Sequence, residues 1–427
     1  VDGIDVSGEN VTAGGGSSLL NTRLLDLERV EVVKGPQAGL YGRNAFAGAI
    51  SYITRQPSMT AMEAKVSADI ADYSTYDLRA SVSGPVIDGK LAIGLNLGWY
   101  DSNGYYDNHN SAVPAANGEL NGGDSHGARL VAIYTPTDSL KITGSVSYSE
   151  TDSDPRAVVK VANANTFYLM GQQLPAGTTA DFSFMGTQDY GQWLGTVGSV
   201  NEDDVNLSVS ERTNAPFAGS SDETLLGYLK LEWDLGSTTF RSSTSYLSNE
   251  ATLDEDPEYQ DGVGTVFMGV GLSLANEYRD STDTDYFNQE FTLESNDQGR
   301  WNWLVGLSGF WEDTRNVDNS LGWFNDPNIL FVPGFCGSNP FEFACSYAAS
   351  AVAGTPAKTI DRDTFSWSVF GLVGFDITDR LRLTLEARYI DDEIKVKTNT
   401  SIDRVSQYVF NLPIDFVPLI GHGEAGP

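Results

Sequence analysis

The sequence has 427 residues, with 58 acidic and 26 basic side chains and a formal net charge of −32 at pH 7. This balance argues against a nucleic-acid partner, because phosphate binding needs a positively charged surface. Glycine, with 44 residues, and aromatic residues, at 11% of the chain, are plentiful, whereas no apolar run approaches the roughly 18 residues of a membrane-spanning helix. A chain of this composition can cross a membrane only as strands.

The first part of the chain reads as a compact unit. Two short apolar runs, Val30–Val33 and Ala49–Ile53, flank a turn that contains several glycines. The texture changes after Pro57, where a long series of hairpins begins. We therefore predict two domains, residues 1–58 and residues 59–427.

Period-two alternation is the main signal after residue 60. Leu91, Ile93, Leu95, Leu97 and Trp99 give one strand a wholly apolar face, and the residues between them are small or polar. The same pattern predicts eleven strands, at residues 61–72, 75–86, 90–101, 125–135, 139–152, 223–235, 237–250, 284–295, 300–313, 363–376 and 380–395. Strands of about 10 to 14 residues exceed the usual five or six and suit a tilted crossing of a bilayer.

The connections between these strands alternate in length. Tight turns are expected at residues 87–89, 135–138, around 236, 295–299 and 376–379, and long polar loops at 102–124, 153–222, 251–283 and 314–362. A soluble sandwich has no reason to place its long loops at one end of the strands. A transmembrane barrel with short periplasmic turns and long external loops does.

Several motifs resemble a known family. Residues 28–36 read ERVEVVKGP, residues 40–45 read LYGRNA, residues 48–50 read GAI and residues 53–57 read ITRQP. With this spacing they resemble the plug-domain signature of TonB-dependent outer-membrane receptors. Residues 287–293, FNQEFTL, and 387–389, ARY, are similar to barrel strands of that family. The chain departs from the pattern at Lys34, where Arg is more usual, at Ala47 in place of Gly and at Ser51 in place of Asn.

The resemblance implies an all-β transmembrane fold, in which a partial α+β plug precedes a partial antiparallel barrel. Family barrels have 22 strands, so about eleven strands make half of one, and the chain is expected to be a fragment. The energy-coupling segment, the TonB box, is expected before residue 1. The implied location is the outer membrane of a Gram-negative bacterium.

The resemblance also implies a function. Such receptors actively import a bulky, scarce nutrient, with a ferric siderophore as the first expectation and cobalamin, haem or an oligosaccharide as alternatives. The expected partners are the TonB–ExbB–ExbD complex, outer-membrane lipid, lipopolysaccharide and a small-molecule ligand. We expect a monomer without a cofactor and without enzymatic activity.

Residues of the plug motif are the candidate gating site. They are Arg29, Glu31, Lys34, Gly35, Pro36, Tyr41, Gly42, Arg43, Gly48 and Arg55. The glycines permit sharp turns. We expect Arg43 or Lys34 to hold the plug against charged residues of the barrel lumen, for which Glu232, Glu290, Glu386 and Arg388 are candidates.

Two further features concern the predicted loops. Cys336 and Cys345 lie close together in a segment without strand alternation, which favours a loop-pinning disulfide and an oxidising compartment. The acidic stretches 254–258 and 280–285 could bind calcium, although neither fits the twelve-residue calcium loop. Ordinary solvation is the simpler interpretation of these carboxylates.

Functions of other classes leave weaker signals. A passive porin would lack the unit at residues 27–57. Residues 123–127, GDSHG, match the nucleophile motif of hydrolases, but that motif requires a strand entering a helix, and here it precedes a strand. An extracellular β-rich enzyme or adhesin is the remaining alternative.

Overall fold

The computed structural model describes fourteen segments of the chain. They are residues 1–6, 25–35, 48–109, 114–116, 118–157, 167–169, 172–174, 215–255, 263–267, 270–296, 299–318, 321–324, 358–378 and 380–400. Within these segments, none of the helices is both long enough and apolar enough to span a membrane.

The unit at the start of the chain contains an antiparallel hairpin. Strand β1, Leu27–Lys34, pairs with β2, Gly48–Thr54, with Val30 opposite Tyr52 and Val32 opposite Ile50. The two apolar runs predicted from the sequence lie in these strands. The described residues of this unit include no helix, so the helical part of the expected α+β plug stays a prediction.

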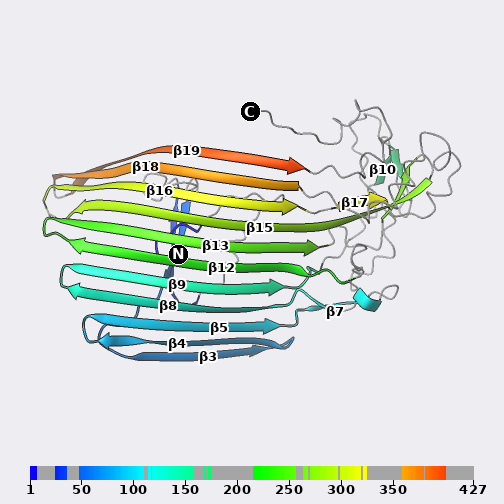
Figure 1. Ribbon diagram of the computed structural model, residues 1–427, viewed down its shortest axis with the longest axis horizontal. Coiled ribbons are helices and arrows are strands. Elements are labelled where there is room, and N and C mark those ends of the chain that lie inside the picture. The colour runs from blue at the N-terminus through cyan, green and yellow to red at the C-terminus, as the bar shows by residue number, and fades with distance from the viewer. Residues whose placement is uncertain are drawn as a thin grey trace.

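The rest of the described chain is dominated by one antiparallel sheet, which we call the wall. Eleven strands follow one another in the order β19-β18-β16-β15-β13-β12-β9-β8-β5-β4-β3 (Figure 1). Their bounds are β3 Glu63–Ala71, β4 Thr75–Ile87, β5 Leu91–Ser102, β8 Gly123–Thr137, β9 Leu140–Ser153, β12 Gly219–Asp234, β13 Thr238–Glu255, β15 Val270–Ser295, β16 Trp301–Asp318, β18 Lys358–Thr378 and β19 Leu381–Thr400. Each predicted strand corresponds to one of these, so the prediction of eleven strands is confirmed.

Shorter elements lie beyond the wall at its long-loop end. They are β6 Tyr106–Asn108 paired with β7 Gly118–Leu120, the single turn η2 Pro114–Ala116, and β10 Phe167–Leu169 paired with β11 Gln172–Leu174. Strands β14 Val263–Phe267 and β17 Leu321–Phe324 both pair with β15.

All five predicted tight turns join neighbouring strands at one end of the wall, on the left in Figure 1. The lengths of the outer strand ends differ from the prediction. Strand β15 has 26 residues and β13 continues to Glu255, so much of the loop expected at 251–283 is strand. Residues 276–283 of β15 are polar apart from Tyr278, so this part of the extension lacks the apolar alternation on which the sequence prediction depended.

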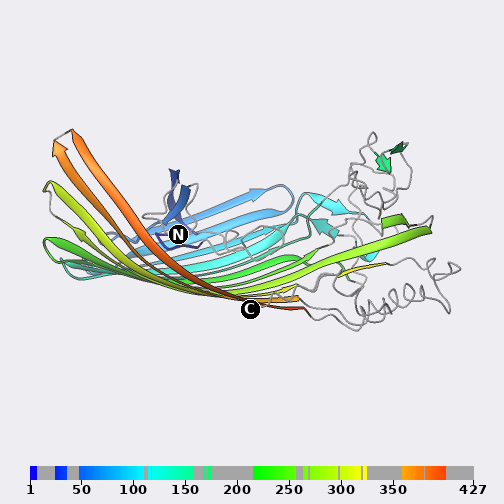
Figure 2. The same ribbon diagram turned by 90° about the horizontal axis from the view of Figure 1, so that it is seen from above.

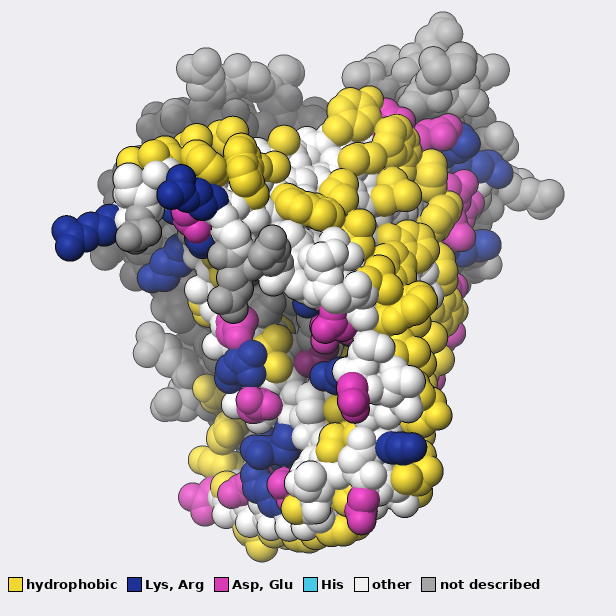
Figure 3. Space-filling model, turned by 90° about the vertical axis from the view of Figure 1, so that its left-hand side faces the viewer, with side chains coloured by type: hydrophobic (Ala, Val, Ile, Leu, Met, Phe, Trp, Pro, Cys, Tyr) yellow, Lys and Arg dark blue, Asp and Glu magenta, His cyan; other side chains and the backbone are white. Residues whose placement is uncertain are grey.

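The wall is curved, and the β1–β2 hairpin lies on its concave side (Figure 2). Leu95, Leu97, Leu229, Val305 and Leu385 are exposed on the opposite, convex side, whereas polar residues such as Asn96, Arg129 and Thr224 are buried on the concave side. The view of the tight-turn end shows hydrophobic side chains gathered along the outer surface (Figure 3). This inside-out distribution is that of a barrel wall with lipid outside and a polar lumen inside.

Aromatic residues mark both rims of the apolar surface. Trp99, Tyr246 and Tyr389 are exposed near the long-loop end, and Tyr134, Trp233 and Trp301 near the tight turns. Such bands are typical of the two membrane interfaces. Tyr100 follows Trp99 on the same strand and therefore faces the concave side, so it does not belong to the outer band.

Candidate functional site

Arg29 and Glu31, two of the predicted residues, form an ion pair within β1. Nε of Arg29 lies 2.7 Å from Oε1 of Glu31, and Nη1 lies 3.0 Å from Oε1 of Glu28. The hydrogen bond with Glu31 raises the pKa of Arg29. All three side chains are about half exposed, so these pairs contribute little to stability.

The turn after β1 is only partly described. Lys34 is exposed at the end of β1, and Gly35 has a φ of +92°, which favours glycine. Gly48 has a φ of +153°, and a Cβ there would collide with the carbonyl oxygen of Val33. Pro36, Tyr41, Gly42 and Arg43 lie outside the described residues, so the pairing proposed for Arg43 stays a prediction.

Arg55 contacts both the plug and the wall. Its Nε lies 3.3 Å from Oδ1 of Asp26, and its backbone N–H donates to the Asp26 carbonyl at 2.9 Å. Its own carbonyl accepts a hydrogen bond from Nη1 of Arg129 at 3.5 Å. Arg55 thus meets the wall through its backbone rather than through its charge.

The predicted lumen partners are engaged mainly by the wall itself. Glu232 pairs with Arg241 at 2.8 Å, and Arg241 also binds Glu294 at 2.5 Å. Nη2 of Arg388 donates to the hydroxyls of Ser308 and Ser368 at 3.0 and 2.8 Å. Glu290 interacts electrostatically with Arg388 and Lys230. Glu386 is exposed on β19.

The residue that joins the plug to the wall most closely is Asp2, which the sequence did not single out. Its Oδ1 accepts the backbone N–H of Thr54 at 2.8 Å, and its Oδ2 accepts the Thr54 hydroxyl at 2.7 Å. The phenol of Tyr228 donates to the same Oδ2 at 2.9 Å. Nη2 of Arg129 lies 3.5 Å from Oδ2. One carboxylate therefore binds the β1–β2 hairpin, β8 and β12.

Lys230 completes this group. Its Nζ donates to the Asp2 carbonyl and lies 5.0 Å from the centroid of the Tyr228 ring. We call Asp2, Thr54, Arg129, Tyr228 and Lys230 the latch. The Arg129 and Asp2 side chains are only 5% and 6% exposed, and a buried charge left without its partner is strongly unfavourable.

An apolar contact lies beside the latch. Ile4 is buried in a cluster with Leu226 and Tyr228 of β12, Leu247 of β13 and Tyr286 of β15. The Tyr286 hydroxyl donates to the carbonyl of Asp5. Residues 1–6 are thus held against the concave side by polar and apolar contacts together.

A second contact between the plug and the wall lies over two glycines of the wall. Gly98 of β5 and Gly127 of β8 are cross-strand partners, and Leu25 of the plug packs over both. A Cβ at Gly98 would lie 2.5 Å from Cδ2 of Leu25. Leu25 is buried, so the two glycines form a notch for this side chain.

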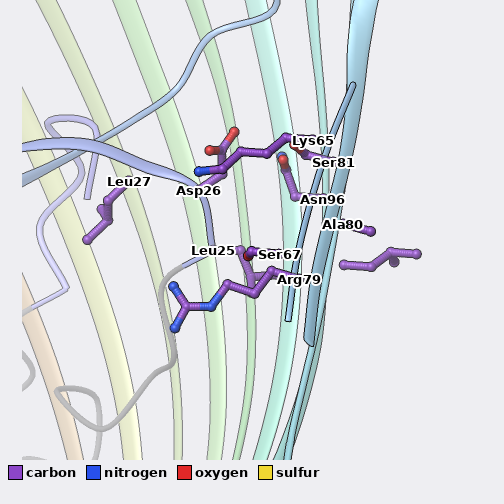
Figure 4. Close-up of a pocket in the computed structure, with 10 residues that line it drawn as sticks. Leu25, Asp26, Leu27, Lys65, Ser67, Arg79, Ala80, Ser81 and Asn96 are labelled. Atoms are coloured by element: carbon purple, nitrogen blue, oxygen red, sulfur yellow. The ribbon is translucent and has the colours of Figure 1, made fainter. Parts of the chain in front are cut away.

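A cavity opens between this part of the plug and the first three wall strands. Leu25, Asp26 and Leu27 line it from the plug, and Lys65, Ser67, Arg79, Ser81 and Asn96 are among the residues that line it from the wall (Figure 4). Arg79 is paired with Asp77 at 2.7 Å. The described residues of the plug thus leave space on the concave side next to β3 and β4.

The structure describes only part of the predicted calcium and disulfide sites. Asp254 pairs with Arg279 at 3.0 Å and Glu255 with Arg156 at 2.6 Å, so these carboxylates already have cationic partners. Among the described residues, no group of three potential ligands could hold a metal ion. Residues 256–258, Cys336 and Cys345 lie outside the described residues, and the calcium and disulfide predictions stay untested.

The hydrolase motif does not form the turn that its chemistry needs. Ser125 lies within β8, is 2% exposed, and its Oγ is 3.0 Å from the Thr151 hydroxyl of β9. Its surroundings are those of a strand residue on the lumen face.

Comparison with known proteins agrees with this architecture. The family model of the TonB-dependent Receptor Plug Domain matches residues 1–49. The pesticin receptor of Yersinia enterocolitica is 35% identical over 68 residues, which are 16% of this chain and 10% of that protein. The metal-pseudopaline receptor CntO of Pseudomonas aeruginosa is 32% identical over 82 residues, 19% of this chain and 11% of the relative.

Solved structures resemble nearly the whole chain. The ferric yersiniabactin uptake receptor FyuA from Yersinia pestis matches with a TM-score of 0.54 at 13% identity, over 88% of this chain and 49% of that one. The ferripyoverdine receptor of Pseudomonas aeruginosa gives 0.52 at 15% identity, over 88% and 43%. The chain spans at most about half the length of these proteins. Through its plug-domain match at residues 1–49, its inside-out wall and these barrel relatives, the chain is similar to the TonB-dependent receptors of the Gram-negative outer membrane.

Proposed function

We propose that this chain is part of a receptor that actively imports a bulky, scarce nutrient across the outer membrane. The observation that carries the proposal is the latch, because the plug sits on the lumen side of the wall and is held there by buried polar contacts around Asp2. A passive pore needs no such element. A gated receptor needs a plug that stays bound to the wall without energy input and is released when mechanical work is done on it.

The latch has the properties of such a gate. Each buried hydrogen bond contributes about 0.5–1.5 kcal/mol net, and more when a charge takes part. Three neighbouring contacts to Asp2, from Arg129, Tyr228 and Lys230 of the wall, would hold the plug against thermal opening but would yield to a directed pull on residues 1–6. The proposed source of that pull is the TonB–ExbB–ExbD complex, acting through the TonB box of the full-length receptor.

The proposed cargo is a ferric siderophore. Support comes from the relatives, which include receptors for ferric yersiniabactin, ferripyoverdine and metal-pseudopaline. Cobalamin, haem and an oligosaccharide are the alternative cargoes. The receptor is proposed to act as a monomer embedded in lipid and lipopolysaccharide.

Uptake by cells tests this function directly. The full-length receptor is expressed in a strain that lacks its own siderophore receptors, and the cells are offered ⁵⁵Fe on a panel of siderophores, with labelled cobalamin and haem beside it. We expect accumulation from at least one ferric siderophore that stops when TonB is deleted. Accumulation that persists without TonB would refute the proposal, and TonB-dependent uptake of cobalamin or haem alone would reassign the cargo.

A further inference from the structure

Two tyrosines stand exposed beyond the membrane-facing part of the wall. Tyr73 lies in the turn between β3 and β4, and Tyr105 lies between β5 and β6, at the long-loop end in Figure 1. Their ring centroids are 4.9 Å apart at an interplanar angle of 65°, and the residues are 54% and 60% exposed. The nearest aromatic pair of the membrane rim, Tyr76 and Trp99, is a separate stack at 6.4 Å.

The backbone at Tyr73 is strained. Tyr73 and Ser74 have φ angles of +60° and +51°, in the left-handed region that favours glycine. Each non-glycine residue there costs on the order of 1 kcal/mol. Ala71 pairs with Thr75, so the hairpin loop has three residues, and loops of this length normally place glycine at a left-handed position. The turn therefore keeps a large aromatic side chain at a position where a smaller residue would be more stable.

Neighbouring contacts hold the two rings in place. The backbone N–H of Asn103 donates to the Tyr73 carbonyl at 3.1 Å, which ties the turn to the segment that carries Tyr105. The hydroxyls of Thr75 and Ser102 lie 2.9 Å apart across the same strands. The ring pair is thus a prearranged surface, which reduces the entropy cost of binding.

Polar residues that flank the two tyrosines in the sequence bear on the ligand chemistry. Asp72 precedes Tyr73, Asp107 lies two residues after Tyr105, and the Asn103 amide is bonded to Glu119 at 2.6 Å. These carboxylates repel anions and accept hydrogen bonds from hydroxyl groups. The electron-rich face of a tyrosine attracts partially positive C–H groups such as those on one side of a sugar ring.

We propose that Tyr73 and Tyr105 form a platform that binds a neutral pyranose on the external surface of the receptor. The rings stack against the sugar, and the neighbouring carboxylates and amide bind its hydroxyls. The sugar can belong to a free oligosaccharide or to the polysaccharide part of lipopolysaccharide, and the chemistry is the same. The platform does not depend on which nutrient the receptor imports.

Binding to purified full-length receptor in detergent tests the platform. The probes are maltohexaose, xylohexaose and the lipid-free polysaccharide released from lipopolysaccharide by mild acid, titrated by calorimetry. We expect at least one probe to bind, and Tyr105→Ala to weaken that binding roughly tenfold through loss of one stacking face. Tyr106→Ala is the matched control, because Tyr106 is 51% exposed in the same segment, and it should bind as the parent does.

Tyr73→Gly separates binding from folding. Glycine relieves the left-handed strain, so this variant should be at least as stable as the parent to heating in detergent while losing saccharide affinity. No binding by any probe, or equal binding by the parent and Tyr105→Ala, would overturn the proposal. Displacement of the probe by tetramethylammonium would also overturn it, because it would identify the platform as a cation site. Which probe binds identifies the source of the sugar.

Discussion

The carboxylate of Asp2 lies 3.5 Å from the guanidinium of Arg129, across the join between the plug and the wall, and both side chains are almost fully buried. Neither charged group is solvated by bulk water. The attachment of residues 1–6 to the wall therefore depends on a small number of buried groups. Substituting these groups tests whether they hold the plug in place.

Removing the Asp2 carboxylate should loosen the plug. Asp2→Ala leaves the buried Arg129 without its counter-charge, which typically costs about 3–5 kcal/mol. We expect higher single-channel conductance and greater sensitivity of cells to vancomycin. Glu31→Gln is the control, because Glu31 forms an exposed pair within β1, and it should behave as the parent. A tight, impermeable Asp2→Ala receptor would show that the latch does not hold the plug.

Filling the glycine notch should unseat the plug at a second place. Gly98→Ala brings a methyl group to 2.5 Å from Leu25, closer than side chains approach one another. We expect raised conductance, and partial restoration when Leu25→Ala is added to make room. Gly227→Ala serves as the control, since its nearest neighbour would be 3.9 Å away. Additive effects of Gly98→Ala and Leu25→Ala would mean that the two positions do not interact.

Two copies of one polar arrangement should stabilise the outer part of the wall. The Asn249 amide donates to Asp222 and Thr224 at 3.1 and 2.8 Å, and the Asn316 amide donates to Asp280 and Thr282 at 2.6 and 2.9 Å. Asn249→Ala and Asn316→Ala each leave a buried carboxylate short of a donor, at a cost of about 1–3 kcal/mol.

Heating the receptor in detergent and following its electrophoretic mobility measures this effect. Both single variants should unfold at lower temperature, and the double variant should show the sum, because the two groups share no residue. Unchanged unfolding temperatures would mean that these amides are replaceable by water.

The contact between the segment that precedes β8 and the segment that follows β9 should depend on pH. The backbone N–H of Asp154 donates to the Gly122 carbonyl at 3.1 Å. Burial raises the pKa of the Asp154 carboxyl, and the nearby Glu119 and Asp124 act in the same direction. Its contribution to stability is fully present below the unfolded pKa of about 3.9 and is lost as pH rises through the raised folded pKa.

Hydrogen exchange of peptides from residues 118–123 and 150–157 measures this dependence. After correction for the intrinsic exchange rate, we expect stronger protection at pH 4.5 than at pH 7.5. Asp154→Asn keeps an acceptor but removes the charge, so protection should become independent of pH. Equal pH dependence in both proteins would assign the effect to another group.

The sequence predicts the wall well because lipid and lumen impose a period of two on each strand. Leu95 and Asn96 alternate between the two environments, and tight turns separate successive strands. The prediction fails where β15 begins well before residue 284, since residues 279–283, RDSTD, are all polar or charged and yet form strand. There, backbone pairing with β13 and β16 extends the strand.

The latch was beyond the reach of sequence patterns. Asp2 belongs to no motif or periodic segment, and its partner Tyr228 is 226 residues away. A partial signal was present, because Arg129 and Lys230 lie on the lumen-facing side of strands whose other face is apolar. Such cations need a counter-charge, but the alternation does not reveal which acid supplies it.

If import requires residues 1–6 to leave the wall, a reversible tether between these residues and the wall should block it. Ile4→Cys with Leu226→Cys places two thiols within the same buried cluster, and either single variant controls for oxidation. When the full-length receptor is cross-linked, its cargo should still bind but TonB-dependent uptake should stop, and reduction should restore it. Uptake at the parental rate by the cross-linked receptor would show that residues 1–6 stay on the wall during import.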